Sequence, residues 1–503
     1  MVATETQLPA TFERGRRHGG KVDLSTTENV RWVSKLGTNA YGNPTVAHGR
    51  VFVGTDAKAV VDDPRFDPPP AGVVVCLNES NGKMLWRLAV PERTYGLPDS
   101  NHFVMQRCGI CSSPTVVGNR VYLVTSADEV VCLDVHGLAD GNDGPFQDEA
   151  QYMAGRGRPP IKLNAHDADI IWRFDLIDQL GVCPHDAASC SVLIEGDVLY
   201  TSTSNGVGGD KGSHWTKMHA YVVKPKAPAF VALDKNTGRL LAVDGAGIST
   251  RLWHAQWSSP SLGVVNGKKL VFLGGGDGYC YAFEALSHMP SKPTKLKLVW
   301  KYDCNPPEYR CPNGVPVGYY RGDKRQNPAN KNDGKYVGPS QVIATPVFYH
   351  NRVYIGIGQD PAHGRGRGMF HCIDATQQGD VTKTACVWRY DGIERSLSTA
   401  AIQDGLVYIP DLAGKIHCLD AETGHVYWVY ETKGQTWGST LVADGKLFFG
   451  NQRYFFVFAA GRKPQLLSKI RLGAPIYSSP IAANGVVYVS TGRELWAIGH
   501  KRN

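Results

Sequence analysis

The sequence lacks several features that assign a chain of this length to a common class of protein. It contains no run of about 18 apolar residues without a charge, which excludes a membrane-spanning helix. It has no CxxCH for covalent haem, no HExxH, no glycine-rich phosphate loop and no paired CxxC zinc site. Its 56 Gly and 30 Pro interrupt it too often for a coiled coil, and its 42% hydrophobic content is too high for a disordered chain.

The charge of the chain is small and evenly spread. The 54 Lys and Arg exceed the 46 Asp and Glu by a net charge of +8 over 503 residues. Proteins that bind nucleic acid usually concentrate such charge on one face, so we expect a mildly basic surface and no nucleic-acid partner. The first residues, MVATETQLPA, lack the positive start and apolar middle of a secretory signal. Either the protein is cytosolic, or the chain is a mature form with a new initiator Met.

The 12 cysteines fall into groups with different surroundings. Four recur in one local frame and are expected to be small apolar strand residues: Cys76, Cys132, Cys372 and Cys418. Six others lie in loops rich in Pro, Gly and Asp: Cys108, Cys111, Cys183, Cys190, Cys304 and Cys311. Close pairs in polar loops favour disulfides and an oxidising compartment. We therefore expect a periplasmic or secreted protein, with the cytoplasm as the less favoured alternative.

One phrase recurs eight times along the chain. Its copies begin at Asn43, Ser112, Cys190, Ser258, Ala344, Ser398, Gly438 and Ser478. In each copy two short apolar runs are joined by a dipeptide such as Asp-Gly or Asn-Gly, which tight hairpins require. A third run and a fourth, usually containing Trp, follow. The repeat predicts an all-β, eight-bladed β-propeller with four antiparallel strands in each blade.

The ends of the chain provide an internal check on this fold. The last copy supplies only three strands before His500, which would leave an exposed edge. The segment VRWVSKL at Val30–Leu36 has the pattern of a fourth strand. We predict that this N-terminal strand completes the last blade and closes the ring. Residues 1–28 would form an N-terminal arm, and residues 29–503 a single propeller with long loops on one face, which we expect to be monomeric.

Two phrases of the repeat are specific enough to indicate a family. LDAETGHVYW at Leu419–Trp428 and SSPIAANGVVYV at Ser478 resemble the quinoprotein-type propeller superfamily. This superfamily includes alcohol dehydrogenases that depend on pyrroloquinoline quinone (PQQ) and the outer-membrane-assembly lipoprotein of bacteria. The resemblance extends from about Val30 to His500 and implies the same eight-bladed fold. Because the superfamily contains both enzymes and cofactor-free scaffolds, function has to be argued from the site.

The strand order predicts where a site would lie. Loops that lead into an innermost strand, and loops that join second to third strands, should emerge on one face, which we call the loop-rich face. The long insertions concentrate there: residues 56–71, 91–110, 204–228, 305–343 and 359–368. The insertion 136–169 joins a third to a fourth strand and is expected on the opposite face. Polar residues before each innermost strand, with Trp257 and Trp437, would line a central funnel that holds either a planar cofactor or water.

A PQQ site implies residues that this chain supplies only in part. The PQQ-dependent enzymes that this chain resembles place a disulfide of adjacent cysteines over the cofactor. No two cysteines are adjacent in this sequence. The nearest match is Cys108-Gly-Ile-Cys111, which could be redox-active or could form a structural disulfide. The other candidates are Trp257 or Trp437 as the stacking floor, Asp360 or Asp411 as the base, and Arg365 or Arg395 at a quinone oxygen. Each of these candidates is equally well explained as a loop residue in an ordinary turn.

Two hypotheses therefore remain open. The first is a binding or scaffold propeller of the cell envelope that binds a protein, a glycan or a small molecule at its funnel face. The alternative is a divergent quinoprotein oxidoreductase acting on an alcohol or sugar, with PQQ and calcium as cofactors. No metal ligand is assigned, because His185, His363 and His371 are scattered and imidazoles in such positions usually hydrogen-bond the backbone.

Overall fold

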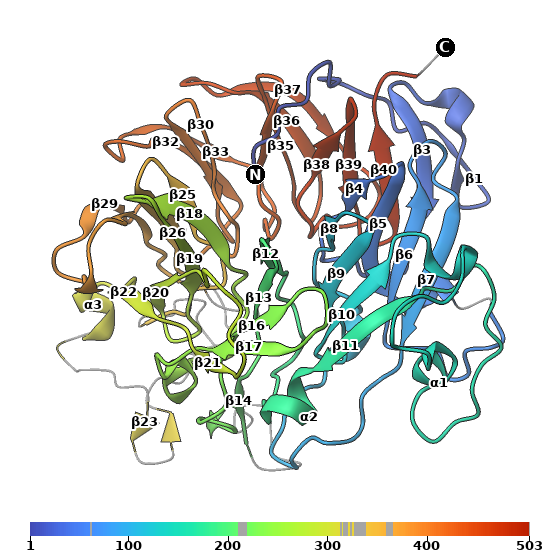
Figure 1. The fold of residues 1–503 in the computed structure, drawn as a ribbon. Coiled ribbons are helices and arrows are strands. Elements are labelled where there is room, and N and C mark those ends of the chain that lie inside the picture. Colours follow the sequence, from blue (N-terminus) through green and yellow to red (C-terminus); the bar gives the residue numbers. More distant parts are fainter. Residues whose placement is uncertain are drawn as a thin grey trace.

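The chain folds as a ring of eight four-stranded antiparallel blades, which confirms the all-β, eight-bladed propeller (Figure 1). The computed structural model describes residues 1–60, 63–209, 219–311, 314, 320–321, 324–325, 339–358 and 366–501. Asp360, His363 and Arg365 lie outside the described residues. Among the described residues, no helix is both long enough and apolar enough to cross a membrane.

The first four blades, each from its inner to its outer strand, contain the following elements. Blade 1 has β4 (Thr45–Ala47), β5 (Arg50–Asp56), β6 (Gly72–Asn78) and β7 (Met84–Val90); blade 2 has β8 (Thr115–Val117), β9 (Arg120–Val124), β10 (Glu129–Asp134) and β11 (Ile170–Asp175). Blade 3 has β12 (Leu193–Glu195), β13 (Val198–Ser202), β16 (Phe230–Asp234) and β17 (Leu240–Val243), extended by the parallel β21 (Thr294–Lys295). Blade 4 has β18 (Ser261–Val265), β19 (Lys268–Gly274), β20 (Tyr279–Glu284) and β22 (Leu298–Asp303), extended by the parallel β28 (Gly379–Asp380).

The last four blades complete the ring. Blade 5 has β25 (Val347–Tyr349), β26 (Arg352–Gly356), β27 (Phe370–Asp374) and β29 (Cys386–Tyr390); blade 6 has β30 (Ala401–Gln403), β31 (Leu406–Pro410), β32 (Lys415–Asp420) and β33 (Val426–Glu431). Blade 7 has β34 (Leu441–Ala443), β35 (Lys446–Gly450), β36 (Phe455–Ala459) and β37 (Gln465–Ile470). Blade 8 has β38 (Ile481–Ala483), β39 (Val486–Ser490), β40 (Glu494–Ile498) and β3 (Val30–Lys35).

Short elements occupy the connections between strands. The helices are α1 (Glu149–Ala154), α2 (Leu176–Leu180) and α3 (Pro307–Arg310), with 3-10 turns at Leu24–Thr26, Ala57–Val60, Gln106–Cys108, Gly137–Ala139 and Ile248–Arg251. Two-stranded ribbons pair β1 (Arg17–His18) with β2 (Lys21–Val22), β14 (Val207–Gly208) with β15 (Tyr221–Val222), and β23 (Tyr320–Arg321) with β24 (Lys324–Arg325). Figure 1 shows α1, α2, β14 and β23 at the same lower edge of the ring.

A tryptophan of the fourth strand links six of the eight blades to the next blade. Trp86 donates its indole N–H to the carbonyl of Val135 at 2.9 Å, and Trp428 donates to that of Gly461 at 3.0 Å. Four more indoles make the equivalent bond: Trp32, Trp172, Trp300 and Trp388. The glycine of the LDxxTG phrase makes room for the ring, since a Cβ on Gly424 would lie 2.7 Å from the indole of Trp388. The repeat therefore encodes the blade interface itself.

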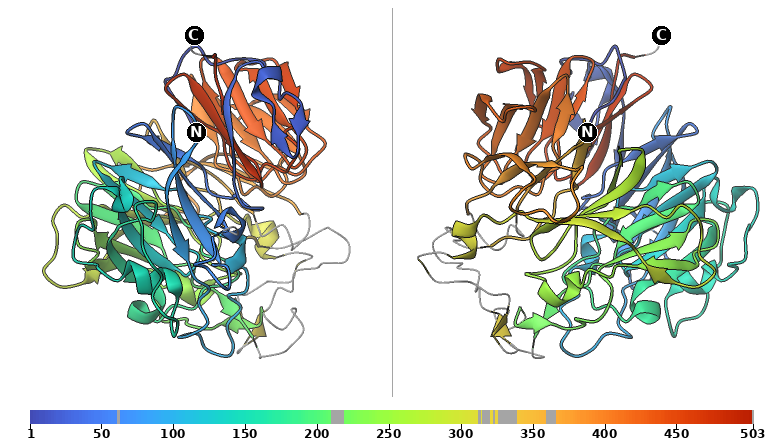
Figure 2. Two further views of the ribbon diagram at one scale, coloured as in Figure 1. Left: turned by 90° about the vertical axis from the view of Figure 1, so that its right-hand side faces the viewer. Right: turned by 60° about the vertical axis from the view of Figure 1, so that its left-hand side comes forward.

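The N-terminal strand closes the ring as predicted. β3 pairs antiparallel with β40 and forms the outer edge of blade 8, while Trp32 reaches Glu79 in blade 1 at 2.8 Å. Figure 2 shows the last blades, in orange and red, beside the N-terminal segments in blue. Upstream of β3, the Met1 ammonium donates to the Thr440 carbonyl at 2.6 Å, and Phe12 packs edge-on against Phe455. The beginning of the described chain thus covers blades 7 and 8.

Candidate functional site

A ring of hydroxyl and amide oxygens surrounds the central axis, just before the innermost strands. In each case a backbone N–H of one blade donates to a side-chain oxygen of the next, as in Ser113 N to Ser191 Oγ at 2.9 Å. The same bond joins Asn43 to Ser113, Ser191 to Ser259, Thr345 to Thr399, Thr399 to Ser439, Ser439 to Ser479, and Ser479 to Asn43. The polar funnel ring predicted from the sequence therefore connects neighbouring blades.

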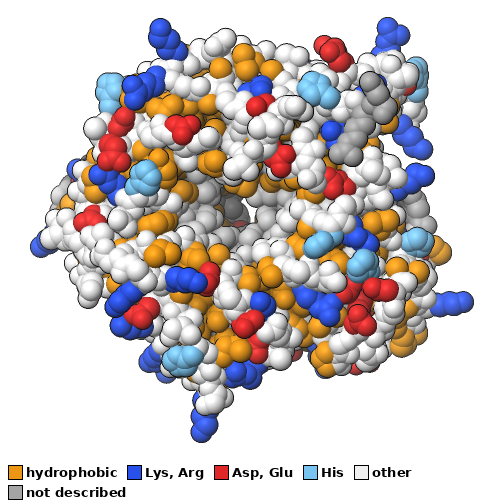
Figure 3. All heavy atoms as spheres, turned by 45° about the horizontal axis from the view of Figure 1, so that its top comes forward, with side chains coloured by type: hydrophobic (Ala, Val, Ile, Leu, Met, Phe, Trp, Pro, Cys, Tyr) orange, Lys and Arg blue, Asp and Glu red, His pale blue; other side chains and the backbone are white. Residues whose placement is uncertain are grey.

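A second row of hydroxyls makes further contacts across the blade junctions. Ser258 donates to the carbonyl of Ala344 at 2.8 Å, and Ser398 donates to that of Gly438 at 2.9 Å. Both serines are buried. Ser258 also accepts from the Gly274 N–H of its own blade at 3.2 Å, and Ser478 donates to the Ser490 carbonyl of its own blade at 3.0 Å, so these hydroxyls hold the start of an innermost strand within the blade as well as across the junction. Figure 3 shows that the face opposite the loop-rich face is hollowed at its centre.

All 12 cysteines are free thiols in the structure, so the expected disulfides are not confirmed. The Cys111 Sγ contacts the carbonyl of Gly109, and the Cys190 Sγ contacts that of Gln256. Burial raises the pKa of the Cys111 thiol, and burial together with Asp186 and Asp56 raises the pKa of the Cys108 thiol. Both cysteines are therefore held as protonated thiols, whereas redox catalysis requires a thiolate.

The strand cysteines behave as the repeat predicts. Cys76, Cys132, Cys372 and Cys418 lie directly opposite the docking tryptophan of the fourth strand in their blades, as in the pair Cys418 and Trp428. All four are buried. They serve as small apolar residues beside the indole.

The candidate base Asp411 is fully buried in the turn between the second and third strands of blade 6. Its carboxylate accepts the backbone N–H groups of Lys415 at 2.9 Å and Glu394 at 3.2 Å. It also lies 3.1 Å from the Nε2 of His417. These contacts belong to the blade rather than to an open cavity. Arg395 is likewise buried, at 1% exposure, and its backbone carbonyl accepts from Leu412.

The two candidate tryptophans lie in different surroundings. Trp437 is half-buried and packs with Tyr41 and Tyr477, at ring centroid distances of 6.0 and 4.8 Å. Tyr41 and Tyr477 are themselves stacked at 5.2 Å, so three neighbouring blades contribute one aromatic group. Trp257 is 8% exposed, donates to the carbonyl of Ala187 at 3.1 Å and meets His254 edge-on at 4.7 Å.

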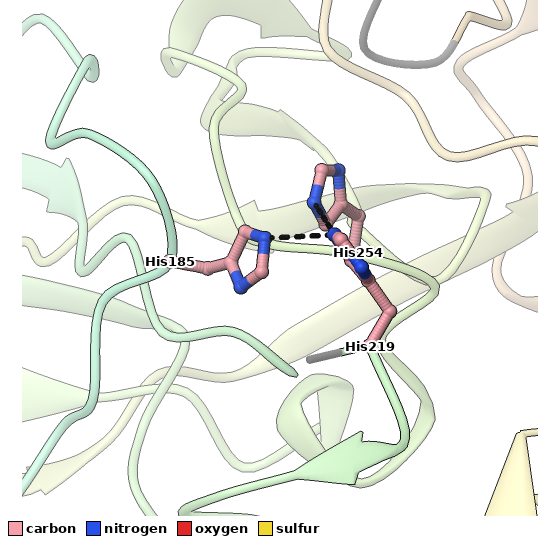
Figure 4. A group of neighbouring side chains, drawn as sticks. All are labelled: His185, His219 and His254. Atoms are coloured by element: carbon pink, nitrogen blue, oxygen red, sulfur yellow. Dashed lines mark hydrogen bonds between the residues drawn. The ribbon is translucent and has the colours of Figure 1, made fainter. Parts of the chain in front are cut away.

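A histidine cluster that sequence reasoning missed lies beside Trp257. His185, His219 and His254 turn their Nε2 atoms toward one another (Figure 4). His219 Nε2 lies 3.1 Å from His185 Nε2 and 2.9 Å from His254 Nε2. Asp186 and His102 border the group. In the sequence His185 is one of several scattered histidines. Its proximity to His219 and His254 on the loop-rich face can be recognised only when the blades are arranged in a ring.

A cavity of about 970 Å³ opens on the loop-rich face beside blades 1 and 2. Its lining comes from residues 65–70, 91–95 and 146–162, together with Glu129 and Arg173. Arg93 and Arg156 lie over the ring of Tyr95 at 4.5 and 4.7 Å. The expectation that the insertion 136–169 stays on the opposite face is therefore wrong. Its α1 contacts β7 and brings part of the insertion to the same cavity as the loop-rich residues.

Comparisons with known proteins agree with the fold. A family model described as outer membrane protein assembly factor BamB matches residues 19–207 and 377–462. No curated protein matches the sequence.

Solved structures resemble the chain over almost its full length. BamB from Moraxella catarrhalis has a TM-score of 0.52 at 12% identity, covering 94% of this chain and 98% of its own. The quinohemoprotein alcohol dehydrogenase ADHIIG from Pseudomonas putida HK5 has a TM-score of 0.52 at 11% identity, covering 94% and 76%. The computationally designed Ika8 protein has a TM-score of 0.50 at 9% identity, covering 93% and 99%. At such low identity these likenesses concern the fold alone.

Proposed function

The chain belongs to the family of the outer membrane protein assembly factor BamB, and we propose that it is a binding or scaffold protein that engages its partner through the loop-rich face. The structural likeness to BamB from Moraxella catarrhalis supports this role at the level of fold. The proposed location is the cell envelope, either periplasmic or secreted. The partner is a protein, a glycan or a small molecule.

One observation carries the proposal. The hydroxyl ring that would hydrogen-bond a planar cofactor is occupied by contacts between blades, as in the bond from Ser113 N to Ser191 Oγ. Among the described candidates, Asp411 is held inside a turn and Cys108 and Cys111 are protonated thiols. These observations support the scaffold over a PQQ site, because the ring oxygens and Asp411 already hydrogen-bond within the propeller.

The loop-rich face has the composition of a binding surface. Arginine and tyrosine are enriched among residues that dominate binding energy, and the lining of the 970 Å³ cavity includes the exposed Arg156 and the half-buried Tyr95 and Tyr152. Within it, Tyr152 donates to the Glu129 carboxylate at 2.6 Å, and Arg173 pairs with the same carboxylate. These internal bonds preorganise the walls, which reduces the entropy lost on binding.

The alternative is a divergent quinoprotein oxidoreductase acting on an alcohol or sugar. The observation that favours it is the aromatic group of Tyr41, Trp437 and Tyr477, which offers half-buried ring faces where a planar molecule could stack. PQQ with calcium would be its cofactor.

Titration of the purified chain with PQQ and Ca²⁺ distinguishes the two functions. For a scaffold we expect no binding heat and no reduction of a dye acceptor with alcohols or sugars. PQQ binding that is lost in Trp437→Ala and kept in Tyr427→Ala, on the outer strand β33, would overturn the scaffold proposal. Dye reduction by any alcohol or sugar would do the same.

A further inference from the structure

We propose that His185, His219 and His254, with Asp186 beside them, bind one divalent transition-metal ion on the loop-rich face. This site is independent of the scaffold function proposed above. The three histidines come from three loops: His185 precedes blade 3, His219 lies between β14 and β15, and His254 precedes blade 4. Figure 4 shows the three rings converging from these separate segments.

The distances match a shared metal ion. Nitrogens that bind one tetrahedral zinc ion at about 2.0–2.1 Å lie about 3.3–3.4 Å apart. The Nε2 of His219 lies 3.1 Å from that of His185 and 2.9 Å from that of His254. All three ligand atoms lie within 4.8 Å of one another. The two shorter separations are a few tenths of an ångström below this spacing, and the third pair, at no more than 4.8 Å, would have to close to it.

The protonation of His185 identifies which nitrogen is available. Its Nδ1 lies 2.6 Å from the carbonyl of Val207, so Nδ1 carries the hydrogen and donates it. In the neutral ring, Nε2 then presents a lone pair toward His219. A hydrogen bond between histidine nitrogens uses one proton for two of them, whereas a single cation accepts a lone pair from all three. A backbone carbonyl on the far nitrogen is also the usual partner of a metal-binding histidine.

The ligand set indicates the class of ion. Imidazole nitrogens favour zinc, copper, iron or nickel over calcium and magnesium, which prefer oxygen ligands. Asp186 Oδ2 lies 3.6 Å from His185 Nε2 and 3.8 Å from His254 Nε2, where it could provide a fourth ligand. His102 Nε2, at 3.4 Å from Asp186 Oδ1, is placed to orient that carboxylate. Three imidazoles and one carboxylate suit a zinc-type ion.

The backbone around the cluster is arranged to bring these side chains together. Asp186 has a φ of 55°, and this left-handed turn lets the adjacent side chains of His185 and Asp186 face one cluster. Two backbone hydrogen bonds hold this turn at Asp186. The Asp186 N–H donates to the His102 carbonyl, and the Met105 N–H donates to the Asp186 carbonyl. Gly206 allows the loops to approach, because a Cβ there would lie 2.5 Å from that of His185.

Burial favours ligation by the same groups. The side chains of His185 and His254 are 0% and 2% exposed, while Asp186 is 18% exposed. Trp257 covers one side of His254, with ring centroids 4.7 Å apart. The nitrogens of His185 and His254 therefore lie in a largely buried site. A bound ion would join three separate loops of the loop-rich face.

Zinc and cobalt titrations of the tag-free chain, after dialysis against a chelator, test the site. We expect one Zn²⁺ bound per chain by calorimetry and elemental analysis, a rise in melting temperature, and visible absorption from bound Co²⁺. Failure of the wild-type chain to bind Zn²⁺, or Co²⁺ bound without such absorption, would show that the cluster is only a group of hydrogen-bonded imidazoles.

Four variants locate the ion. His219→Ala, which removes a half-buried loop side chain, should weaken Zn²⁺ binding by at least about 100-fold. Asp186→Asn keeps a residue that tolerates left-handed backbone and should weaken Zn²⁺ binding about 10-fold. His102→Ala should weaken Zn²⁺ binding by a similar factor. His425→Ala, an exposed histidine near β33, should change nothing. Unchanged binding in a folded His219→Ala, checked by circular dichroism, would overturn the proposal.

Discussion

Two groups of histidines in this protein differ in how their ring nitrogens are satisfied. His371 and His417 occupy the same position in the third strands of blades 5 and 6. In each, Nδ1 accepts from a tyrosine of the preceding blade, Tyr302 at 3.2 Å and Tyr390 at 3.1 Å. Their Nε2 atoms donate to the Cys304 carbonyl and to Asp411. Both rings therefore belong to the interfaces between blades.

The loop histidines bond to one another. His185, His219 and His254 direct Nε2 toward each other, and they lie on the connections that precede blades 3 and 4 and on the loop between β14 and β15. The comparison shows that the two strand histidines bond across blade interfaces, whereas the three loop histidines bond to one another and form a group outside the repeat. Stability should therefore depend on the first group and metal binding on the second.

Removing a docking indole should have the largest effect on stability. Trp300 is fully buried and donates to Ala375 at 3.1 Å, so Trp300→Ala should lower the free energy of unfolding by about 3–5 kcal/mol. Chemical denaturation measures this change. Zn²⁺ binding at 25 °C should stay unchanged, and its loss would show that the two regions are coupled. Trp300→Phe, which keeps most of the ring volume, provides the milder control.

Replacing a strand histidine should have the next largest effect. His371→Leu leaves the Cys304 carbonyl and the Tyr302 hydroxyl without their partner, at a cost of about 2–3 kcal/mol. Burial lowers the pKa of His371 to about 4, so the folded ring stays neutral where the unfolded ring, with a pKa of 6.5, takes up a proton. The free energy of unfolding of the wild type should therefore fall as the pH is lowered from 6.5 to 4. The difference in free energy of unfolding between the wild type and His371→Leu should narrow over the same range. Melting curves across this range measure it; a constant gap would contradict the prediction.

Substitution of Asp169, at the end of the insertion 136–169, should stabilise the protein. Burial, with Glu149 and Asp134 nearby, raises the pKa of Asp169 to about 7. The unfolded carboxyl loses its proton near pH 4 while the folded one keeps it, so the wild type loses stability as the pH rises from about 4 to 7. Asp169→Asn can still accept from Asp143 N and should gain about 1–2 kcal/mol at pH 8. A gain that does not shrink toward pH 4 in melting experiments would refute this explanation.

Loss of one hydroxyl from the funnel ring should have the smallest effect. Ser191→Ala removes the acceptor of the Ser113 N–H, which should cost about 1 kcal/mol because the ring retains its other bonds. Ser287→Ala, on an exposed loop, is the control and should leave the melting temperature unchanged. Equal melting temperatures for both variants would mean that the ring adds little to the blade interfaces.

Local phrases of the sequence account for the scaffold. The Asp404-Gly405 and Asn484-Gly485 turns have positive φ at both residues, as tight hairpins need. The LDxxTG phrase at Leu419–Gly424 predicts both the turn and the place where Trp388 docks. These features follow from residues a few positions apart, so a single blade reveals them, and their repetition predicts eight blades closed by Val30–Lys35.

The candidate site depended on contacts that no local phrase contains. Trp257 and Trp437 were found because they precede innermost strands, but their surroundings differ in ways that only packing reveals. Cys108 and Cys111 suggested redox chemistry by their spacing, while burial holds them as thiols.

The architecture of this protein can be derived from its amino-acid sequence, because each blade is specified by residues that are close along the chain. Which loop residues meet depends on how the blades are arranged around the ring. His185 and His254 are far apart in sequence and become neighbours because consecutive blades present their loops on one face of a closed ring. Closure of the ring brings together loop residues that follow no repeat in the sequence, so the site depends on the whole fold.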